Sequence, residues 1–148
     1  MSTEDSTAVV RRFLDEVISR GNMAALDETC APDLIWHGGS VGEFRSREEF
    51  KQGVSPFFSA FPDLRVTADD VLSEGDKVVC RYTWDGTHRG DFFGVPATSR
   101  RVTVSGMSVY RVAGGKIVEE WWLEDLLGLM QQLGAIPAPG QAQPVSSE

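Results

Sequence analysis

Asp125 is the side chain best placed to do chemistry in this chain. It follows the aromatic segment 117–124 and precedes an apolar segment with a helical pattern. A carboxyl group beside tryptophans can be kept from water, and burial disfavours its charged form and raises its pKa. Such a group can remove a proton from one atom and return it to another. The alternative is structural, because Asp is favoured at helix N-caps and Leu126 begins the helical segment.

The two histidines, His37 and His88, are further candidates for proton transfer. For each, the alternative is a hydrogen-bonded structural role. Two histidines do not fill a three-ligand metal site, and no CxxC, HxxxH or clustered carboxylate pattern adds ligands, so we expect no metal. Cys30 and Cys80 are predicted to be buried free thiols.

The apolar periodicity predicts that helices come first along the chain. Three helices are expected, over residues 9–18, 22–30 and 46–61, after a polar and frayed segment 1–5. Pro56 should kink the third helix.

Strands follow the helices. A short strand is expected over residues 33–39, and from Leu64 the pattern changes to alternation. Further strands and a final short helix are predicted over residues 77–89, 100–112, 117–124 and 126–133. This order predicts an α+β fold, in which a curved, mostly antiparallel sheet packs with three N-terminal helices into a cone (an α+β barrel) with an internal pocket. We expect a single domain over residues 1–136 and a disordered tail over 137–148.

Composition narrows the possible partners. The chain has 148 residues, is 41% hydrophobic and carries a net charge of −8. That charge argues against nucleic acid or an anionic membrane surface, since both attract basic patches. No apolar run reaches the length of a membrane span, and the N-terminus lacks the pattern of a signal peptide. We therefore expect a cytoplasmic protein whose ligand is small and neutral or weakly charged.

Strand alternation predicts which side chains share a face with Asp125. If Asp125 points into the pocket, Trp121 and Leu123 should share its face, while Trp122 and Glu124 face the other way. A bulge would reverse this assignment. We expect the glutamates of this segment to form a solvated or interfacial face: Glu119, Glu120 and Glu124.

The same alternation places His88 with two aromatic residues of its strand. If His88 reaches the pocket, Tyr82 and Trp84 line it too. Trp36 is expected in the wall as well, and Phe92 lies in a loop that should help to set the pocket size.

Three segments resemble the SnoaL-like polyketide cyclases, also called ester cyclases. They are AFPDLRV (60–66), SEGDKVVCRYTWDGTHRGDFFGVPATSRRV (73–102) and GGKIVEEWWLEDLLGLMQQLG (114–134). The family has the nuclear-transport-factor-2-like fold, shared with ketosteroid isomerase and limonene epoxide hydrolase. The resemblance covers roughly residues 8 to 136. It departs from the family at 96–99, where Pro-Ala-Thr-Ser replaces the frequent Pro-Pro-Thr-Gly.

This resemblance implies a reaction and its residues. In characterised cyclases of the group, an aspartate between the final strand and helix acts as acid and base in an aldol ring closure without cofactor or metal. The matching residue is Asp125, and His37 and His88 match histidines that family members often have. The resemblance implies a cofactor-free cyclase acting on a polyketide-like or other apolar carbonyl substrate. It also implies a homodimer formed through the outer face of the sheet.

Other functions fit the same pocket. An isomerase, a hydratase, an epoxide-opening enzyme or a pericyclic cyclase could use it, and so could a binding module without catalysis. An Asp–Arg–Asp relay for epoxide opening would need an inward arginine, and Arg81 and Arg111 on predicted strands are the candidates.

Overall fold

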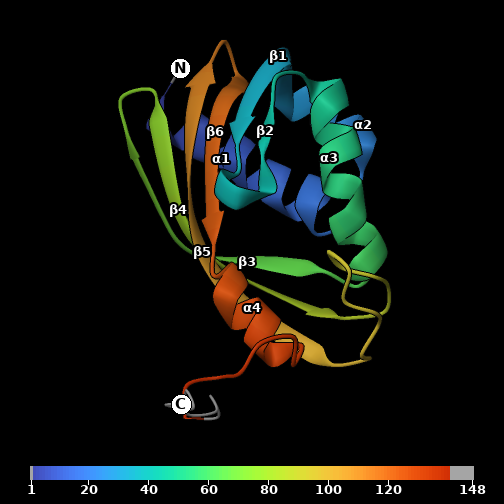
Figure 1. Ribbon diagram of the computed structural model, residues 1–148. Coiled ribbons are helices and arrows are strands. Elements are labelled where there is room, and N and C mark those ends of the chain that lie inside the picture. The colour runs from blue at the N-terminus through green and yellow to red at the C-terminus, as the bar shows by residue number, and fades with distance from the viewer. Residues whose placement is uncertain (1, 141–148) are drawn as a thin grey trace, which may run out of the picture.

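A six-stranded curved sheet forms the frame of the protein (Figure 1). The computed structural model describes residues 2–140. The strand order is β2-β1-β6-β5-β4-β3, and neighbouring strands are antiparallel except for β1 and β6, which run parallel. The strands are β1 (Cys30–His37), β2 (Glu43–Phe44), β3 (Arg65–Glu74), β4 (Lys77–Thr87), β5 (Arg101–Ala113) and β6 (Lys116–Glu124).

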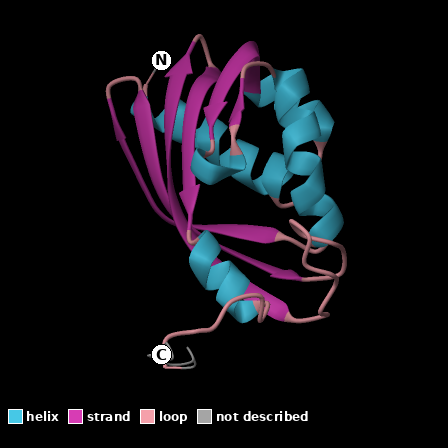
Figure 2. Ribbon diagram, in the orientation of Figure 1, coloured by secondary structure: helices cyan, strands magenta, loops and turns pink. Residues whose placement is uncertain are grey.

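The N-terminal helices cover one face of this sheet (Figure 2). The helical segments are α1 (Thr3–Arg12), the π-helical η1 (Phe13–Ile18), α2 (Met23–Thr29), the 3₁₀ segment η2 (Gly39–Val41), α3 (Arg47–Ala60) and α4 (Leu126–Gln132). The predicted α+β class and the curved, mostly antiparallel sheet are confirmed. Among the described residues, no helix is long and apolar enough to cross a membrane.

Several predicted boundaries were wrong for local reasons. The segment expected to fray begins α1 instead, because Ser2 and Asp5 form a capping box. Cys30 lies in β1 rather than in the second helix. The helix α3 spans Arg47–Ala60 with Pro56 inside it, close to the predicted bounds. The short edge strand β2 carried too little pattern to be predicted. The predicted disordered tail, residues 137–148, lies mostly outside the described residues.

The core lies between the helices and the concave face of the sheet. Burial alternates along β4, with Val78, Cys80, Tyr82 and Trp84 pointing inward. From the helical layer, Phe13 contacts Tyr110 of β5 with ring centroids 6.0 Å apart. Cys30 and Cys80 are both buried free thiols, as predicted, and burial raises the pKa of Cys30 to about 12 and that of Cys80 to about 11.

One carboxyl group lies inside this core. Glu120 of β6 has no exposed surface, and neither of its carboxyl oxygens has a hydrogen-bond partner. Burial raises the pKa of Glu120 to about 8, and the nearby polar groups of Trp36 and Tyr110 offset only part of that effect. Glu120 was expected on a solvated or interfacial face, so this expectation was wrong. A register shift opposite Ile117 and Glu119 changes the alternation along the strand and turns Glu120 inward.

The Glu120 carboxyl should make stability depend on pH. The folded state holds its proton up to about pH 8, whereas the unfolded chain releases it near the ordinary value of 4.5. The contribution of Glu120 to the free energy of unfolding is therefore largest below pH 4.5, and it is lost as the pH rises through 8. Relative to the wild type, Glu120→Gln should become more stable by about 3–5 kcal/mol between pH 5 and pH 8.5. Urea unfolding at both pH values measures this difference.

The matched control is Glu74→Gln, which changes an exposed carboxylate at the end of β3. It should leave the pH dependence of unfolding as in the wild type. If Glu120→Gln also left it unchanged, Glu120 would not be a buried neutral acid.

Candidate functional site

An apolar cavity lies between the concave face of the sheet and α3. Its volume is about 50 Å³, enough for a few water molecules, since one water needs roughly 10–15 Å³ on this measure. Helical and sheet residues share the wall, which consists of Ile18, Trp36, Val54, Phe57, Phe58, Leu64, Trp84, Trp122 and Glu124.

Glu124 is the ionisable side chain in this wall. Its Oε2 accepts hydrogen bonds from the indole Nε1 of Trp84 at 3.0 Å and of Trp122 at 3.1 Å. Its Oε1 is buried and has no hydrogen-bond partner among residues 2–140. Burial raises the pKa of Glu124, and the two indole N–H groups offset part of that rise because they favour the charged form. The carboxyl group is thus fixed through one oxygen, while the other is free to exchange a proton.

A hydrogen bond between β4 and β6 holds the backbone next to Glu124 in place. It passes across β5 at Gly106, where the absence of a side chain leaves room for it. The hydroxyl of Tyr82 on β4 reaches across β5 and donates to the backbone oxygen of Leu123 at 2.9 Å. A Cβ at Gly106 would lie 2.2 Å from that hydroxyl oxygen, so only glycine leaves room for it. The Tyr82 ring also stacks on Trp122, with centroids 4.2 Å apart. Tyr82, predicted in the substrate site, therefore lies behind the wall and supports it.

Asp125 lies outside the cavity. It is the N-cap of α4, exposed to solvent, and its Oδ1 accepts a hydrogen bond from the backbone N–H of Gly128 at 2.8 Å. Leu123 and Asp125 share one face as predicted, but it is the outer face: Trp122 and Glu124 line the cavity while Leu123 is 65% exposed. The physical reason is that the chain leaves the strand at Asp125 to cap the helix, so the last inward position belongs to Glu124.

His37 and Trp121 lie on the outer face of the sheet, not in the pocket where they were predicted. The His37 ring lies between two carboxylates, with Nδ1 2.8 Å from Glu43 and Nε2 2.8 Å from Glu119. Each ring nitrogen of His37 therefore lies within hydrogen-bond distance of a carboxylate oxygen. Its hydrogen bond lowers the pKa of Glu119, and Trp121 stacks on the ring at 5.3 Å.

The remaining predicted site residues lie on the inner face. Trp36 and Trp84 are in the cavity wall. Phe92 is buried behind the wall, where it packs against Phe57 with ring centroids 5.2 Å apart. His88 is fully buried, and its Nδ1 accepts a hydrogen bond from the backbone N–H of Thr98 at 3.1 Å.

The alternation argument missed Glu124 and Trp122. The signal that pointed to them was Asp125 as an N-cap, because a capping carboxylate turns toward the helix that follows it.

The arginines considered for an epoxide-opening relay also point away from the pocket. Arg81 pairs with Asp70, and Arg111 pairs with Glu119, both on the outer face. Among residues 2–140, no group of three or more His, Cys, Asp or Glu side chains is arranged to hold a metal ion.

The fold matches known structures along nearly the whole chain. A protein from Jannaschia sp. CCS1, described as a "putative SnoaL-like polyketide cyclase", is 28% identical over 91% of this chain and 95% of its own, with a TM-score of 0.84. Wild-type IdmH from Streptomyces antibioticus, described as a "putative polyketide cyclase", is 31% identical over 87% of this chain and 98% of its own, with a TM-score of 0.79.

A more distant structure shows the fold alone. An LEH-like epoxide hydrolase of M. tuberculosis is 15% identical over 90% of this chain and 92% of its own, with a TM-score of 0.71.

No curated protein sequence matches the chain. The model of the SnoaL-like polyketide cyclases matches residues 8–133. Together with the cone and its apolar cavity, this match shows that the chain belongs to the SnoaL-like polyketide cyclase family.

Proposed function

We propose that the protein is a cofactor-free cyclase that acts on a polyketide-like or other apolar carbonyl substrate, with Glu124 as its proton-transfer group. One observation carries this proposal: within the described part of the chain, Glu124 is the ionisable side chain in an apolar cavity, and its Oε1 has no hydrogen-bond partner there. Family membership supports a cyclase or isomerase type of reaction. The assignment replaces Asp125, whose carboxylate caps α4 outside the cavity.

The carboxyl group can serve as base and then as acid. In a ring closure by aldol addition, Oε1 takes a proton from the carbon next to a carbonyl, and that carbon then bonds to a second carbonyl carbon. The same proton passes from Oε1 to the oxygen of the new alkoxide, so the carboxylate is regenerated. A raised pKa makes the carboxylate a stronger base toward carbon, and a well-placed group of this kind contributes about 10²–10⁴-fold.

The cavity must widen to hold such a substrate. Pockets for small organic ligands commonly measure about 300–1,000 Å³, whereas this one measures about 50 Å³. The wall formed by Phe57 and Phe58 comes from α3, and aromatic rings can turn about their side-chain bonds. A substrate held folded by these rings gains from proximity, which can supply about 7–11 kcal/mol in well-oriented reactions.

Two other functions use the same cavity differently. Isomerisation needs the same proton removal, followed by return to another carbon instead of ring closure. A binding module needs the apolar wall without proton transfer. Proton exchange on a simple ketone separates the binding module from both enzymes, because only the enzymes accelerate it.

Glu124→Gln tests the assignment with 2-tetralone, an apolar ketone with exchangeable protons next to its carbonyl. We expect the wild type to accelerate deuterium exchange at this carbon and Glu124→Gln to lower the rate by at least about 10²-fold. The amide keeps the size of the side chain but cannot take the proton. Exchange is followed by proton NMR in D₂O, with the buffer rate subtracted. The wild-type rate should rise with pH through the raised pKa of Glu124, because the charged form is the base.

Asp125→Asn and Asp125→Ala are the matched controls. Asparagine is a good N-cap, so Asp125→Asn should keep both exchange and stability, while Asp125→Ala should cost about 1 kcal/mol of unfolding free energy with exchange retained. Loss of exchange in Asp125→Asn, with full exchange in Glu124→Gln, would return the proton-transfer role to Asp125. Absence of any exchange by the wild type would favour the binding module.

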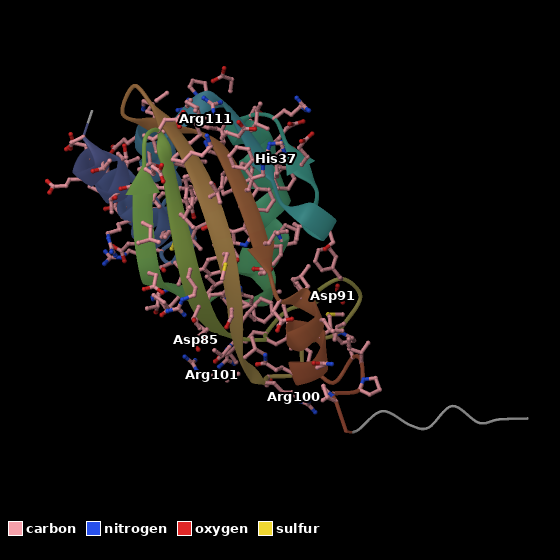
Figure 3. All side chains as sticks on the ribbon, turned by 90° about the vertical axis from the view of Figure 1, so that its left-hand side faces the viewer. His37, Asp85, Asp91, Arg100, Arg101 and Arg111 are labelled. Atoms are coloured by element: carbon pink, nitrogen blue, oxygen red, sulfur yellow. The ribbon has the colours of Figure 1, made fainter. Side chains whose placement is uncertain are left out.

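We also propose that a second copy of the chain covers the outer face of the sheet. Apolar side chains lie exposed there on neighbouring strands: Leu72, Val79, Met107 and Leu123. Figure 3 shows this face, with His37 and Arg111 toward one end and Asp85 and Arg101 toward the other. Exposed apolar patches of this kind mark interaction surfaces in soluble proteins.

Met107→Lys should convert a dimer into monomers. Met107 is 61% exposed and lies opposite Arg81 of β4, so the substitution buries an uncompensated charge in any contact through this face. Light scattering coupled to size-exclusion chromatography should show the mass fall by half. Leu127→Lys is the control, because Leu127 is as exposed but lies on α4. A wild-type monomer, or a Met107→Lys dimer, would contradict the proposed interface.

A further inference from the structure

His88 has a buried donor that the rest of the structure leaves unused. The side chain has no exposed surface, and its Nε2 has no hydrogen-bond partner in the described part of the chain. A buried polar group without a partner costs free energy, so its presence calls for an explanation.

Thr98 fixes which ring nitrogen carries the proton. Its backbone N–H donates to His88 Nδ1 at 3.1 Å, and its hydroxyl lies 3.0 Å from the same nitrogen. That hydroxyl oxygen already accepts the backbone N–H of Arg100 at 3.2 Å, so its own proton is available to Nδ1. Nδ1 is therefore an acceptor without a proton, and the neutral ring carries its proton on Nε2. Because Nδ1 faces Thr98, Nε2–H is directed away from this loop.

Phe61 contacts both the cavity wall and the His88 ring. Phe61, at the end of α3, packs against Trp84 of the cavity wall with centroids 5.1 Å apart and against His88 with centroids 5.5 Å apart. Phe92 of the following loop packs on the other side of Phe61 at 5.3 Å. If Phe61 turns away, the space between Trp84 and His88 joins the cavity.

The loop that holds Phe92 has the features of a movable cover. Phe93 next to it is 63% exposed and has a φ of 45°, a left-handed conformation that is unfavourable for a bulky residue. Its ring contacts both Phe92 and Phe57 of the cavity wall. Release of this strain would favour movement of the two rings together.

We propose that the substrate pocket extends past Phe61 to His88, and that His88 Nε2–H binds an oxygen of the substrate. Trp84 lies on β4, and His88 directly follows the end of this strand at Thr87. Four residues of extended chain at 3.3 Å per residue place their Cα atoms up to about 13 Å apart. The Trp84 indole in turn contacts Glu124. The oxygen bound by His88 therefore lies at the end of the substrate remote from Glu124. The inference rests on the proposed function and narrows the substrate to an elongated apolar molecule with an accepting oxygen at its far end.

His88 would act as a specificity residue here. A neutral imidazole donates a hydrogen bond without giving up its proton, so it selects the substrate by an accepting oxygen rather than by charge. A site that must hydrogen-bond a ligand discriminates against an analogue without the partner group, because the buried donor then stays unpaired.

Two naphthalenes of nearly the same shape test this selection. 2-Acetylnaphthalene has a carbonyl oxygen where 2-isopropenylnaphthalene has a methylene carbon. We expect the wild type to bind the ketone about tenfold more tightly, as measured for each compound by equilibrium dialysis. Equal affinities for the two compounds would overturn the inference.

Two substitutions distinguish the roles of the two ring nitrogens of His88. His88→Asn keeps an acceptor oxygen near the position of Nδ1 and removes the donor, so the preference for the ketone should disappear. His88→Gln keeps a donor near the position of Nε2, so much of the preference should remain. If His88→Asn fails to fold, the proton NMR signal of ¹⁵N-labelled His88 in the wild type decides. We expect a proton on Nε2 whose signal shifts with the ketone and not with the alkene, and a proton on Nδ1 would contradict the inference.

Phe61→Leu tests the path to His88. A smaller side chain should raise the affinity for both naphthalenes severalfold and leave their ratio as in the wild type. The control is Leu127→Ala, which shortens an exposed side chain on α4 away from the cavity wall and should leave both affinities as in the wild type. Unchanged affinities in Phe61→Leu would contradict a pocket that extends past this ring.

The ketone preference measured with the two naphthalenes does not depend on the role of Glu124. Glu124→Gln should keep the ketone preference even where it abolishes proton exchange on 2-tetralone. A lost preference in His88→Asn with normal exchange supports the inference. A retained preference in His88→Asn overturns it without affecting the assignment of Glu124.

Discussion

The Glu124 carboxyl group, held by two indole N–H groups in an apolar wall, is the interaction on which the site depends. A carboxylate in such surroundings is costly unless it is hydrogen-bonded. Trp84 and Trp122 supply donors to Oε2 from two different strands, and β5 lies between those strands. The order of β4, β5 and β6 in the sheet is therefore a requirement of the site, because it brings both indoles to one oxygen.

The backbone next to Glu124 is held from the same two strands. Gly106 leaves a gap in β5 through which the Tyr82 hydroxyl reaches the backbone oxygen of Leu123. The chain then turns at Asp125, where the carboxylate caps α4 through the N–H of Gly128. Glu124 is thus fixed by one strand contact before it and one helix cap after it. Asp125 belongs to the site as a structural residue, since it ends the strand with Glu124 pointing inward.

The sequence predicted the fold well because fold class depends on patterns that extend over many residues. Helical spacing, strand alternation and the three family segments each span whole elements, so small errors at the N-terminal residues or at Cys30 left the architecture intact. The inward face of β6 depends on single positions instead. A shift of register near Ile117 and the cap at Asp125 each change which side chains face the core, and neither leaves a periodic signal. The outer position of His37 likewise depends on Glu43 and Glu119, which are distant in the sequence and paired only in the folded sheet.

Two glutamates on the inner face of one strand have different environments, and this difference separates their chemistry. Glu120 is enclosed without hydrogen-bond partners and has a pKa of about 8, so it is mostly neutral near pH 7. Glu124 has two indole donors that favour its charged form, and one of its oxygens faces a cavity. Because two charges in one core would repel each other, a neutral Glu120 makes ionisation of Glu124 easier than a charged one would. The strand thereby presents a single carboxylate to the cavity, although both residues are glutamates on its inner face.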